Sequence, residues 1–486
     1  MRLVSVLVPL FGVTCFVGQA FAEGGYYGGL LGSRAAGRGG AFTARADDIT
    51  AVAYNPAGLA KIGGTLIQVG DAFSYNAASF TRATTRDWGA ADGPTVAFAK
   101  VNNQKPWQYL DPLLGAASNL GLPGWGFALA AYAPPGIASE QFPVNGGERY
   151  MMVSRDVQML NYAASVAWRY GEIFGLGVSL QSIYLRKMSY SLVIDGDVFK
   201  QPGNPVQSDY DILANVSASS PFNFNATLGT WYRPVPAIEL GLSAQVVPAN
   251  IQADGHLSVT ALGSLKNLVL RKADGSGKAD NVTLKLPLPM VFRAGGRYRH
   301  LDNNREVFDV EVDLEYTTWS RVNRFVLDAH DLVAHAESSD MPVGIINIEK
   351  QWRDTIAVKL GGDFAVIPGR LTLRAGGYYE TAVAKPAYAQ VDFPNGTQIG
   401  GTIGASAFVG PVELALVYQL RFQPSFSVSE SDGRVYQIVP GSQCKAPYNN
   451  TDNCNEHYLN QPAPVVNAGT YAATSQIVAF DLLYRF

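Results

Sequence analysis

The sequence has 486 residues, of which 16% are charged and 11% are aromatic, and it contains 50 glycines. Soluble proteins carry about 25% charged residues. The net charge of -3 leaves no basic surface of the kind that binds nucleic acid. The composition therefore excludes a typical nucleic-acid-binding protein and favours a sparsely charged, glycine-rich architecture.

Residues 1–22 have the pattern of a secretory signal peptide. Arg2 supplies a positive charge, an apolar run follows, and Ala20-Phe21-Ala22 matches the small-residue cleavage pattern. The run is short for a membrane anchor, and Cys15 lies within it without a convincing lipobox. We therefore predict an exported chain that begins at Glu23. Because no later apolar run could cross a membrane as a helix, this chain is either soluble or a membrane barrel.

The following segment, 23–63, is dominated by glycine, alanine and small polar residues, and it includes most of the stretch YNPAGLAKIGG at 54–64. It has no amphipathic pattern that could build a domain of its own. Small residues allow close backbone packing, so the segment would suit a plug inside a wide barrel. A disordered leader is the alternative.

From residue 64 onwards the dominant pattern is an alternation of apolar and polar residues. In 411–422 and 475–486, every second residue is large and apolar and the intervening ones include Glu413, Arg421 and Asp481. Half-buried soluble sheets also alternate, but these strands have the roughly 9–11 residues that a tilted membrane strand needs. Their apolar faces end in aromatic residues, as an interfacial girdle requires. We predict fourteen strands, at 64–80, 94–101, 124–133, 159–170, 173–190, 222–233, 237–247, 284–299, 306–320, 354–366, 371–380, 398–409, 411–422 and 475–486.

The connections between these strands alternate between short turns and long loops, which is typical of outer-membrane barrels. Segment 102–123 is the exception, and we interpret it as a long connection with a small interfacial helix. The predicted fold is all-β: a 14-stranded antiparallel transmembrane β-barrel over 64–486, with 23–63 as an N-terminal hatch, or plug, in the lumen. An even strand count puts both termini on the periplasmic side of a Gram-negative-type outer membrane. We expect a monomer whose surroundings are outer-membrane lipids and lipopolysaccharide.

Charged residues on two neighbouring strands are predicted to line the lumen, because each would cost about 2–4 kcal/mol on the lipid side. We expect the facing pairs Arg297–Asp309 and Arg293–Asp313 across the turn at 300–305. This ladder would stiffen the wall or hold whatever fills the barrel; alternatively, one arginine would receive a substrate carboxylate. Its members are Arg293, Arg297, Arg299, Asp309, Glu311, Asp313 and Glu315, and Lys359, Arg374, Arg421 and Arg485 are also expected to face inward.

The cysteines and histidines predict a disulfide but no metal or catalytic site. Cys444 and Cys454 lie close together in the chain, with nine residues between them, and in an exported protein such a pair predicts a loop disulfide. Only His457 lies near them, so we expect no metal site. The five histidines fall in predicted loops or at strand ends without a matching serine motif. We expect no enzyme activity and no cofactor.

The stretch GRGGAFTARADDITAVAYNPAGLA resembles the hatch of the FadL/TodX outer-membrane transporters of long-chain fatty acids and aromatic hydrocarbons, which carries an Asn-Pro-Ala motif. That motif is here Asn55-Pro56-Ala57. The resemblance continues through GWGFALAAYAPPGIASEQF, DLEYTTWSRVNRF and the terminal Phe486, and it covers nearly the whole mature chain. The long loops 321–353 and 423–474 do not match the family. The family residues that bind a fatty-acid head group cannot be assigned to positions in this sequence.

The resemblance implies a diffusive channel for a hydrophobic small molecule or lipid. Substrate would enter at the extracellular loops, a shift of the hatch near Asn55-Pro56-Ala57 would open a path, and substrate would leave sideways at a kink in the third strand. That strand is 124–133, and the candidate opening consists of Gly126, Ala128, Ala130, Tyr132, Pro134, Pro135 and Gly136. The same small residues are compatible with simple packing against the hatch. The alternative functions are a general porin or an adhesin-type barrel.

Overall fold

The computed structural model describes residues 30–86, 95–109, 111–134, 139–194, 209–247, 249–393, 395–437 and 465–486. Its helical elements are short: α1 (Ser33–Ala36), α2 (Ala51–Tyr54), η1 (Pro56–Lys61), η3 (Trp319–Arg321) and η4 (Pro386–Tyr388). Within these described residues, none of the helices has the length and apolar character needed to cross a membrane.

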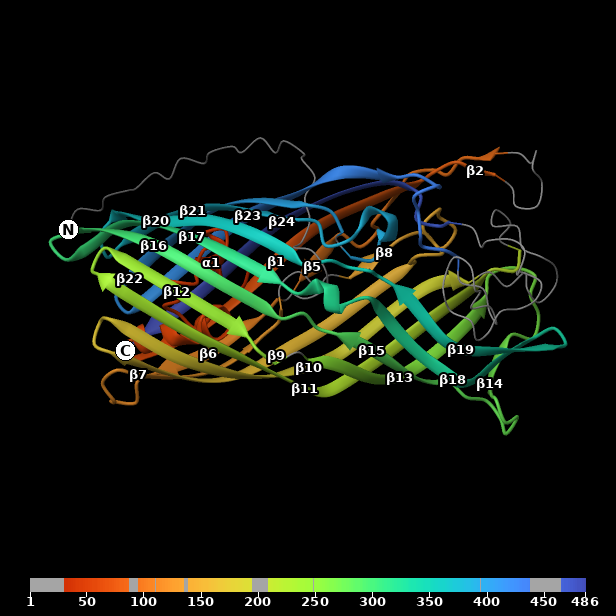
Figure 1. Cartoon of the computed structure of the whole chain (residues 1–486), viewed down its shortest axis with the longest axis horizontal. Coiled ribbons are helices and arrows are strands. Elements are labelled where there is room, and N and C mark those ends of the chain that lie inside the picture. Colours follow the sequence, from red (N-terminus) through yellow and green to blue (C-terminus); the bar gives the residue numbers. More distant parts are fainter. Residues whose placement is uncertain are drawn as a thin grey trace, which may run out of the picture.

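The strand segments follow one another around a single closed sheet (Figure 1). They are β1 (Thr65–Arg82), β4 (Val101–Asn102), β5 (Trp107–Tyr109), β6 (Leu113–Ser118), β7 (Trp125–Tyr132), β8 (Glu140–Gln141), β9 (Ser154–Tyr170), β10 (Phe174–Ile194), β11 (Ile212–Val235), β12 (Ile238–Gln245), β13 (Asn250–Ala261), β14 (Val269–Lys272), β15 (Asn281–Pro287), β16 (Val291–Asp302), β17 (Arg305–Thr317), β18 (Arg324–Ala336), β19 (Ser339–Glu349), β20 (Thr355–Ile367), β21 (Leu371–Glu380), β22 (Gln398–Val409), β23 (Val412–Val428) and β24 (Gly469–Arg485). A separate two-stranded hairpin joins β2 (Thr85–Arg86) to β3 (Thr95–Val96).

The sheet closes where β1 pairs antiparallel with β24, from Leu66 opposite Arg485 to Arg82 opposite Gly469. Counted around the wall, this is the predicted 14-stranded antiparallel barrel, with several strands built from two or three segments. Closure matters because hydrocarbon offers no partner to a free sheet edge. The C-terminus and the short turns lie at one end and the long connections at the other (Figure 1), and we call these ends periplasmic and extracellular.

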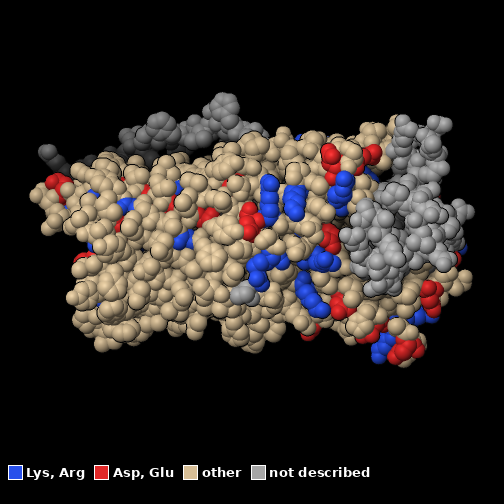
Figure 2. Space-filling model, viewed as in Figure 1, with Lys and Arg blue, Asp and Glu red and all other residues tan. Residues whose placement is uncertain are grey.

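The alternation in sequence becomes an alternation between the outside and the inside of the wall. Along β23, Leu414, Leu416 and Leu420 are exposed outward, whereas Glu413 and Arg421 are buried inside. The periplasmic half of the molecule accordingly shows an almost uncharged outer surface (Figure 2). The apolar belt and the polar lumen are thus produced by the same period of two.

The second strand of the barrel differs from the prediction. We expected it at 94–101, followed by a helix within 102–123, but it consists of β4, β5 and β6, each paired with β1. Pro106 and Pro112 stand in its two interruptions. Proline lacks the N–H that a ladder needs, so it divides the strand into pieces too short for an alternation to be recognised. With the strand at 101–118, the turn that follows is short and the alternation of connections is regular.

The N-terminal segment lies inside the barrel, where α1 is seen between the strands in Figure 1. Its described residues from Leu30 to Ile62 are almost all buried. The apolar ones, including Phe42, Ile49 and Leu59, pack with inward-facing Leu66, Leu113 and Ala128 of the wall. The segment fills the periplasmic half of the lumen as a plug.

Candidate functional site

Asn55 connects the plug to the wall. It has an extended backbone at the start of η1, and its Oδ1 accepts a hydrogen bond from Ala57 N at 3.2 Å. Its Nδ2 donates to Thr43 O at 2.8 Å within the plug and to Thr230 O of β11 at 2.9 Å. Ala57 O accepts from Trp231 Nε1 at 3.0 Å. Asn55-Pro56-Ala57 is therefore a buried turn tied on both flanks to β11.

The wall behind this turn is built from glycine. A Cβ on Gly177 of β10 would lie 2.3 Å from Ala57 N, and one on Gly229 of β11 would lie 2.1 Å from Asn55 Oδ1. Any side chain at either position would displace the turn or the strand. The plug and the wall thus meet backbone to backbone, which only glycine permits.

Arg38 is the centre of the contact between the plug and the opposite wall. Its Nη1 donates to Asp309 Oδ1 at 2.6 Å and to Asp363 Oδ1 at 2.8 Å, and its Nη2 donates to Glu311 Oε2 at 3.0 Å. Nε donates to Ala41 O at 2.9 Å, and the side chain is fully buried. One guanidinium therefore binds three carboxylates from β17 and β20.

The acidic ladder of β17 holds the plug backbone as well. Asp313 Oδ2 accepts from the N–H groups of Phe42 (2.9 Å) and Thr43 (2.8 Å), and Glu311 Oε1 accepts from Ala44 N (2.7 Å). Further plug–wall ion pairs are Arg34–Glu413, Arg45–Asp309 and Lys61–Glu239. Asp309, Glu311, Asp313 and Glu315 all face the lumen, and three of them contact the plug directly.

The pairing across the β16–β17 hairpin is shifted by two residues from the prediction. Arg297 faces Glu311, Arg293 faces Glu315 and Arg299 faces Asp309. The turn consists of Asn303 and Asn304, both with positive φ angles (47° and 60°), the conformation of a two-residue hairpin. An irregularity in the pairing between His300 and Leu301 adds the rest of the shift. Of the ion pairs, only Arg293–Glu315 (2.6 Å) joins directly facing residues. Arg299 pairs with Glu306 (2.7 Å), and Arg297 reaches diagonally to Asp309 (2.5 Å), its predicted partner.

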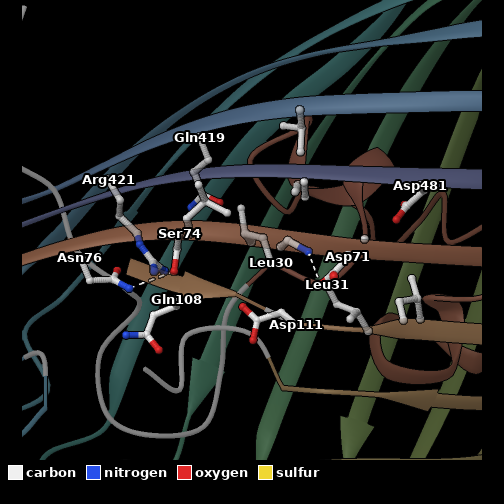
Figure 3. A pocket seen from close by; sticks show the side chains of 17 residues that line it. Leu30, Leu31, Asp71, Ser74, Asn76, Gln108, Asp111, Gln419, Arg421 and Asp481 are labelled. Atoms are coloured by element: carbon white, nitrogen blue, oxygen red, sulfur yellow. Dashed lines mark hydrogen bonds between the residues drawn. The ribbon is translucent and has the colours of Figure 1, made fainter. Parts of the chain in front are cut away.

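A small cavity of about 40 Å³ lies at the leading end of the plug (Figure 3). Leu30 and Leu31 of the plug border it, together with β1, β23, β24 and the interruption of the second strand. Arg421, almost fully buried, points toward Ser74 and Asn76, and Asp111 lies on the other side (Figure 3). The cavity thus combines an apolar wall with a buried cation next to the break in the barrel.

The extracellular half of the interior is apolar. The largest cluster of buried residues includes Phe142, Met152, Ile183, Leu185, Phe325 and Trp352, contributed by the extracellular ends of the strands and by their loops. Within it, Lys350 Nζ pairs with Asp392, donates to Gln390 Oε1 at 3.1 Å and lies 5.1 Å from the Phe325 ring centre. Burial lowers the pKa of Lys350, and Asp392 opposes that shift. A compensated charge pair is therefore enclosed in an aromatic surrounding.

Glu148, in the loop between β8 and β9, is buried without a partner among the described residues for either carboxylate oxygen. The neighbouring Arg149 is turned to Asp211, with Nε and Oδ2 2.9 Å apart. Burial raises the pKa of Glu148 from 4.5 to about 7. The neutral form of this carboxyl is therefore the one that fits the folded loop.

Replacing Glu148 with glutamine is expected to stabilise the protein at alkaline pH. A folded-state pKa above the unfolded one means that the contribution of the wild-type carboxyl is fully present below pH 4.5 and is lost as the pH rises through about 7. Glutamine removes this loss, so Glu148→Gln should gain about 1–3 kcal/mol at pH 8 and almost nothing at pH 5. Thermal unfolding in detergent at both pH values measures it, and an equal effect at the two would contradict it.

The third strand places its small residues against the plug. Gly126, Ala128, Ala130 and Tyr132 face inward, and a Cβ on Gly126 would lie 2.4 Å from Leu59 O. β7 is paired on one side with β6 and on the other with β9. It ends at Tyr132, and β8 begins at Glu140. Pro134 is buried just beyond the strand, while Pro135 and Gly136 lie outside the described residues, as do Cys444 and Cys454.

A model of the family described as Outer membrane protein transport protein (OMPP1/FadL/TodX) matches residues 13–408. No curated protein matches the chain. Among solved structures, a FadL homologue of Pseudomonas aeruginosa is 15% identical, with 96% of this chain and 100% of that one covered and a TM-score of 0.72. The toluene transporter TodX of P. putida is 13% identical (95% and 99% covered, TM-score 0.61), and TbuX of Ralstonia pickettii is 14% identical (94% and 98%, TM-score 0.58). At these identities the structures establish the shared fold.

Proposed function

Because the chain belongs to the OMPP1/FadL/TodX family of outer-membrane transport proteins, we propose that it admits long-chain fatty acids or aromatic hydrocarbons by passive diffusion. The observation that supports this most directly is the apolar cluster in the extracellular half of the lumen, above the plug. A pathway for sugars or ions would need a wet, polar lumen. The family is one of transport channels rather than of enzymes.

The interruptions of the wall support lateral release near the third strand. Strand β7 ends at Tyr132, and the adjacent second strand is interrupted between β4, β5 and β6. On the lumen side of this region, Val157 and Met159 of β9 belong to the apolar cluster. An apolar molecule leaving here would enter hydrocarbon directly, without crossing the plug or the aqueous periplasm.

We place the plug rearrangement that would accompany passage at the leading end of its described residues, Leu30 and Leu31, rather than near Asn55-Pro56-Ala57 as the resemblance implies. Asn55, Pro56 and Ala57 are tied to β11, and Arg38 is held by three wall carboxylates. Leu30 and Leu31, by contrast, border the cavity next to the interrupted strand. Moving the leading end would enlarge this cavity toward the wall while the anchored part stays in place.

Uptake measurements test the proposal. Cells that lack their own transporters for these compounds should take up a radiolabelled long-chain fatty acid or an aromatic hydrocarbon faster when they produce this protein. Liposomes containing the purified barrel should not swell in small sugars, because the plug fills the lumen. Rapid swelling would support the general porin instead. If the protein causes no uptake and no swelling, an adhesin-type barrel is favoured.

A further inference from the structure

The outer wall carries an apolar hollow of about 690 Å³ on β10, β11, β12, β16, β17 and β20. Thr230, Ala244 and Ala294 are small and border it, whereas the other outward-facing side chains around it are bulky. These bulky residues are Leu176, Leu228, Leu242, Phe292, Leu314, Tyr316 and Ile356. The hollow therefore faces the hydrocarbon layer and has the shape of a recess for an acyl chain.

A second groove, of about 430 Å³, lies on the same sector of the outer wall and contains three cations: Lys285, Arg321 and Arg324. Arg321 ends the turn η3, whose Trp319 is buried with its ring centre 5.2 Å from that of Trp352. Arg321 Nε also donates to Leu288 O at 3.4 Å. The packing of the η3 turn therefore holds the Arg321 side chain next to the groove.

Two carboxylates lie near the groove, but neither forms a close ion pair with its cations. Lys285 Nζ is 3.6 Å from Asp328 Oδ2, and Arg324 Nη1 is 3.6 Å from Glu349 Oε1. Lys285 and Arg324 are themselves about half exposed, at 51% and 46% of the side chain. Exposed pairs of this length are weak, so the cations can bind another anion.

The groove lies directly to the extracellular side of the hollow. The chain runs from Ala244 in the hollow to Asn250 in the groove, and from Phe292 to Pro287, through only a few residues each. At a rise of about 3.3 Å per residue, the two sites are at most about 20 Å apart. Figure 2 shows Lys and Arg side chains gathered on this face, where the uncharged wall ends.

We propose that the groove and the hollow form one binding site for lipopolysaccharide of the outer leaflet, with a phosphate in the groove and an acyl chain in the hollow. Arginine and lysine bind phosphate through charge-assisted hydrogen bonds, and an acylated, phosphorylated lipid would fill both parts. The position of the groove on the extracellular side of the hollow favours the lipid of the outer leaflet. The site lies outside the lumen and is independent of the transported substrate.

The test is titration of the detergent-solubilised barrel with purified lipopolysaccharide, followed by native mass spectrometry. The triple variant Lys285→Ala/Arg321→Ala/Arg324→Ala should bind it more weakly, by roughly fivefold for each cation removed. The matched control, Arg271→Ala/Lys272→Ala/Lys278→Ala, removes three exposed cations around β14 and should bind as the wild type does. Barrel integrity is checked by the mobility shift on heating before electrophoresis.

Two further measurements separate the parts of the site. Ala294→Trp fills the hollow and should weaken binding of lipopolysaccharide while leaving all three cations in place. Enzymatically dephosphorylated lipopolysaccharide should bind the wild type weakly, and neither inorganic phosphate nor phosphatidylglycerol vesicles should compete efficiently. Unchanged binding by the triple variant, equal losses in variant and control, or equal competition by phosphatidylglycerol would each overturn the proposal. If the triple variant fails to fold, Lys285→Glu alone, on an exposed side chain, provides the same comparison.

Discussion

Replacing Arg38 with alanine is expected to destabilise the barrel by about 3–5 kcal/mol and to let small ions through the lumen. The guanidinium is fully buried and bonded to Asp309, Asp363 and Glu311. Its removal takes from Glu311 its cation partner among the described ion pairs and leaves Asp309 and Asp363 with Arg45, Arg297 and Arg374. We expect the plug to withdraw from the wall and to admit solvent to the unpaired carboxylate. Thermal unfolding in detergent and single-channel conductance in planar bilayers measure the two consequences.

The control is Arg169→Ala, which removes a half-buried partner of the exposed Glu172 at the periplasmic turn and should cost no more than about 1 kcal/mol. A second substitution, Glu311→Gln in the Arg38→Ala background, should recover part of the loss, because it removes the carboxylate whose ion pair was with Arg38. If Arg38→Ala remains closed to ions and melts with the wild type, the plug is held by its apolar contacts rather than by this ion cluster.

Most of the barrel could be predicted because the alternation of side chains directly reflects the two environments of its wall. Strands such as β23 and β24 are continuous and have one apolar face. The second strand could not be recognised, since β4, β5 and β6 are each too short to show a period and prolines separate them. An interruption that hides a strand from the sequence is also a weak point in the wall.

In the β16–β17 hairpin the predicted register is wrong, but the predicted side of the wall is correct for each charged residue. Shifting the pairing by two residues keeps every charged side chain in the lumen, because the period of a strand is also two. It changes the partners, however: Arg293 pairs with Glu315 rather than with Asp313. Asp313 is then free to accept the backbone N–H groups of Phe42 and Thr43.

The contacts of the plug were beyond the reach of sequence reasoning. Arg38 and Lys61 lie in a segment without periodicity, and their partners Asp363 and Glu239 are 325 and 178 residues away in the chain. The one signal was indirect: the ladder on β17 has four carboxylates, and the facing strand β16 has three arginines. Such an excess of acid in a closed lumen requires cations from elsewhere, and the plug supplies them.

Locking the middle of the plug to the wall is expected to leave uptake of apolar compounds intact. A Cβ on Gly295 of β16 would lie 3.0 Å from the Cβ of Thr43 and 2.3 Å from Asp313 Oδ1, and disulfides need about 3.5–4.5 Å between Cβ atoms. The pair Thr43→Cys/Gly295→Cys can therefore bond once the Asp313 side chain turns away. Cys444 and Cys454 are replaced by serine in this background. Thr43 belongs to the anchored part of the plug, whereas the proposed movement is at Leu30 and Leu31.

Uptake is compared in the same cells under oxidising conditions and after reduction, so each protein sample is its own control. The complementary variant, Ala479→Phe, projects a ring into the cavity at the leading end and should slow uptake while the disulfide does not. If oxidation stops uptake and reduction restores it, the plug must move as a whole, including Asn55-Pro56-Ala57. The ion pairs of Arg38 would then have to break in every transport cycle, a cost that passive diffusion offers no energy source to offset.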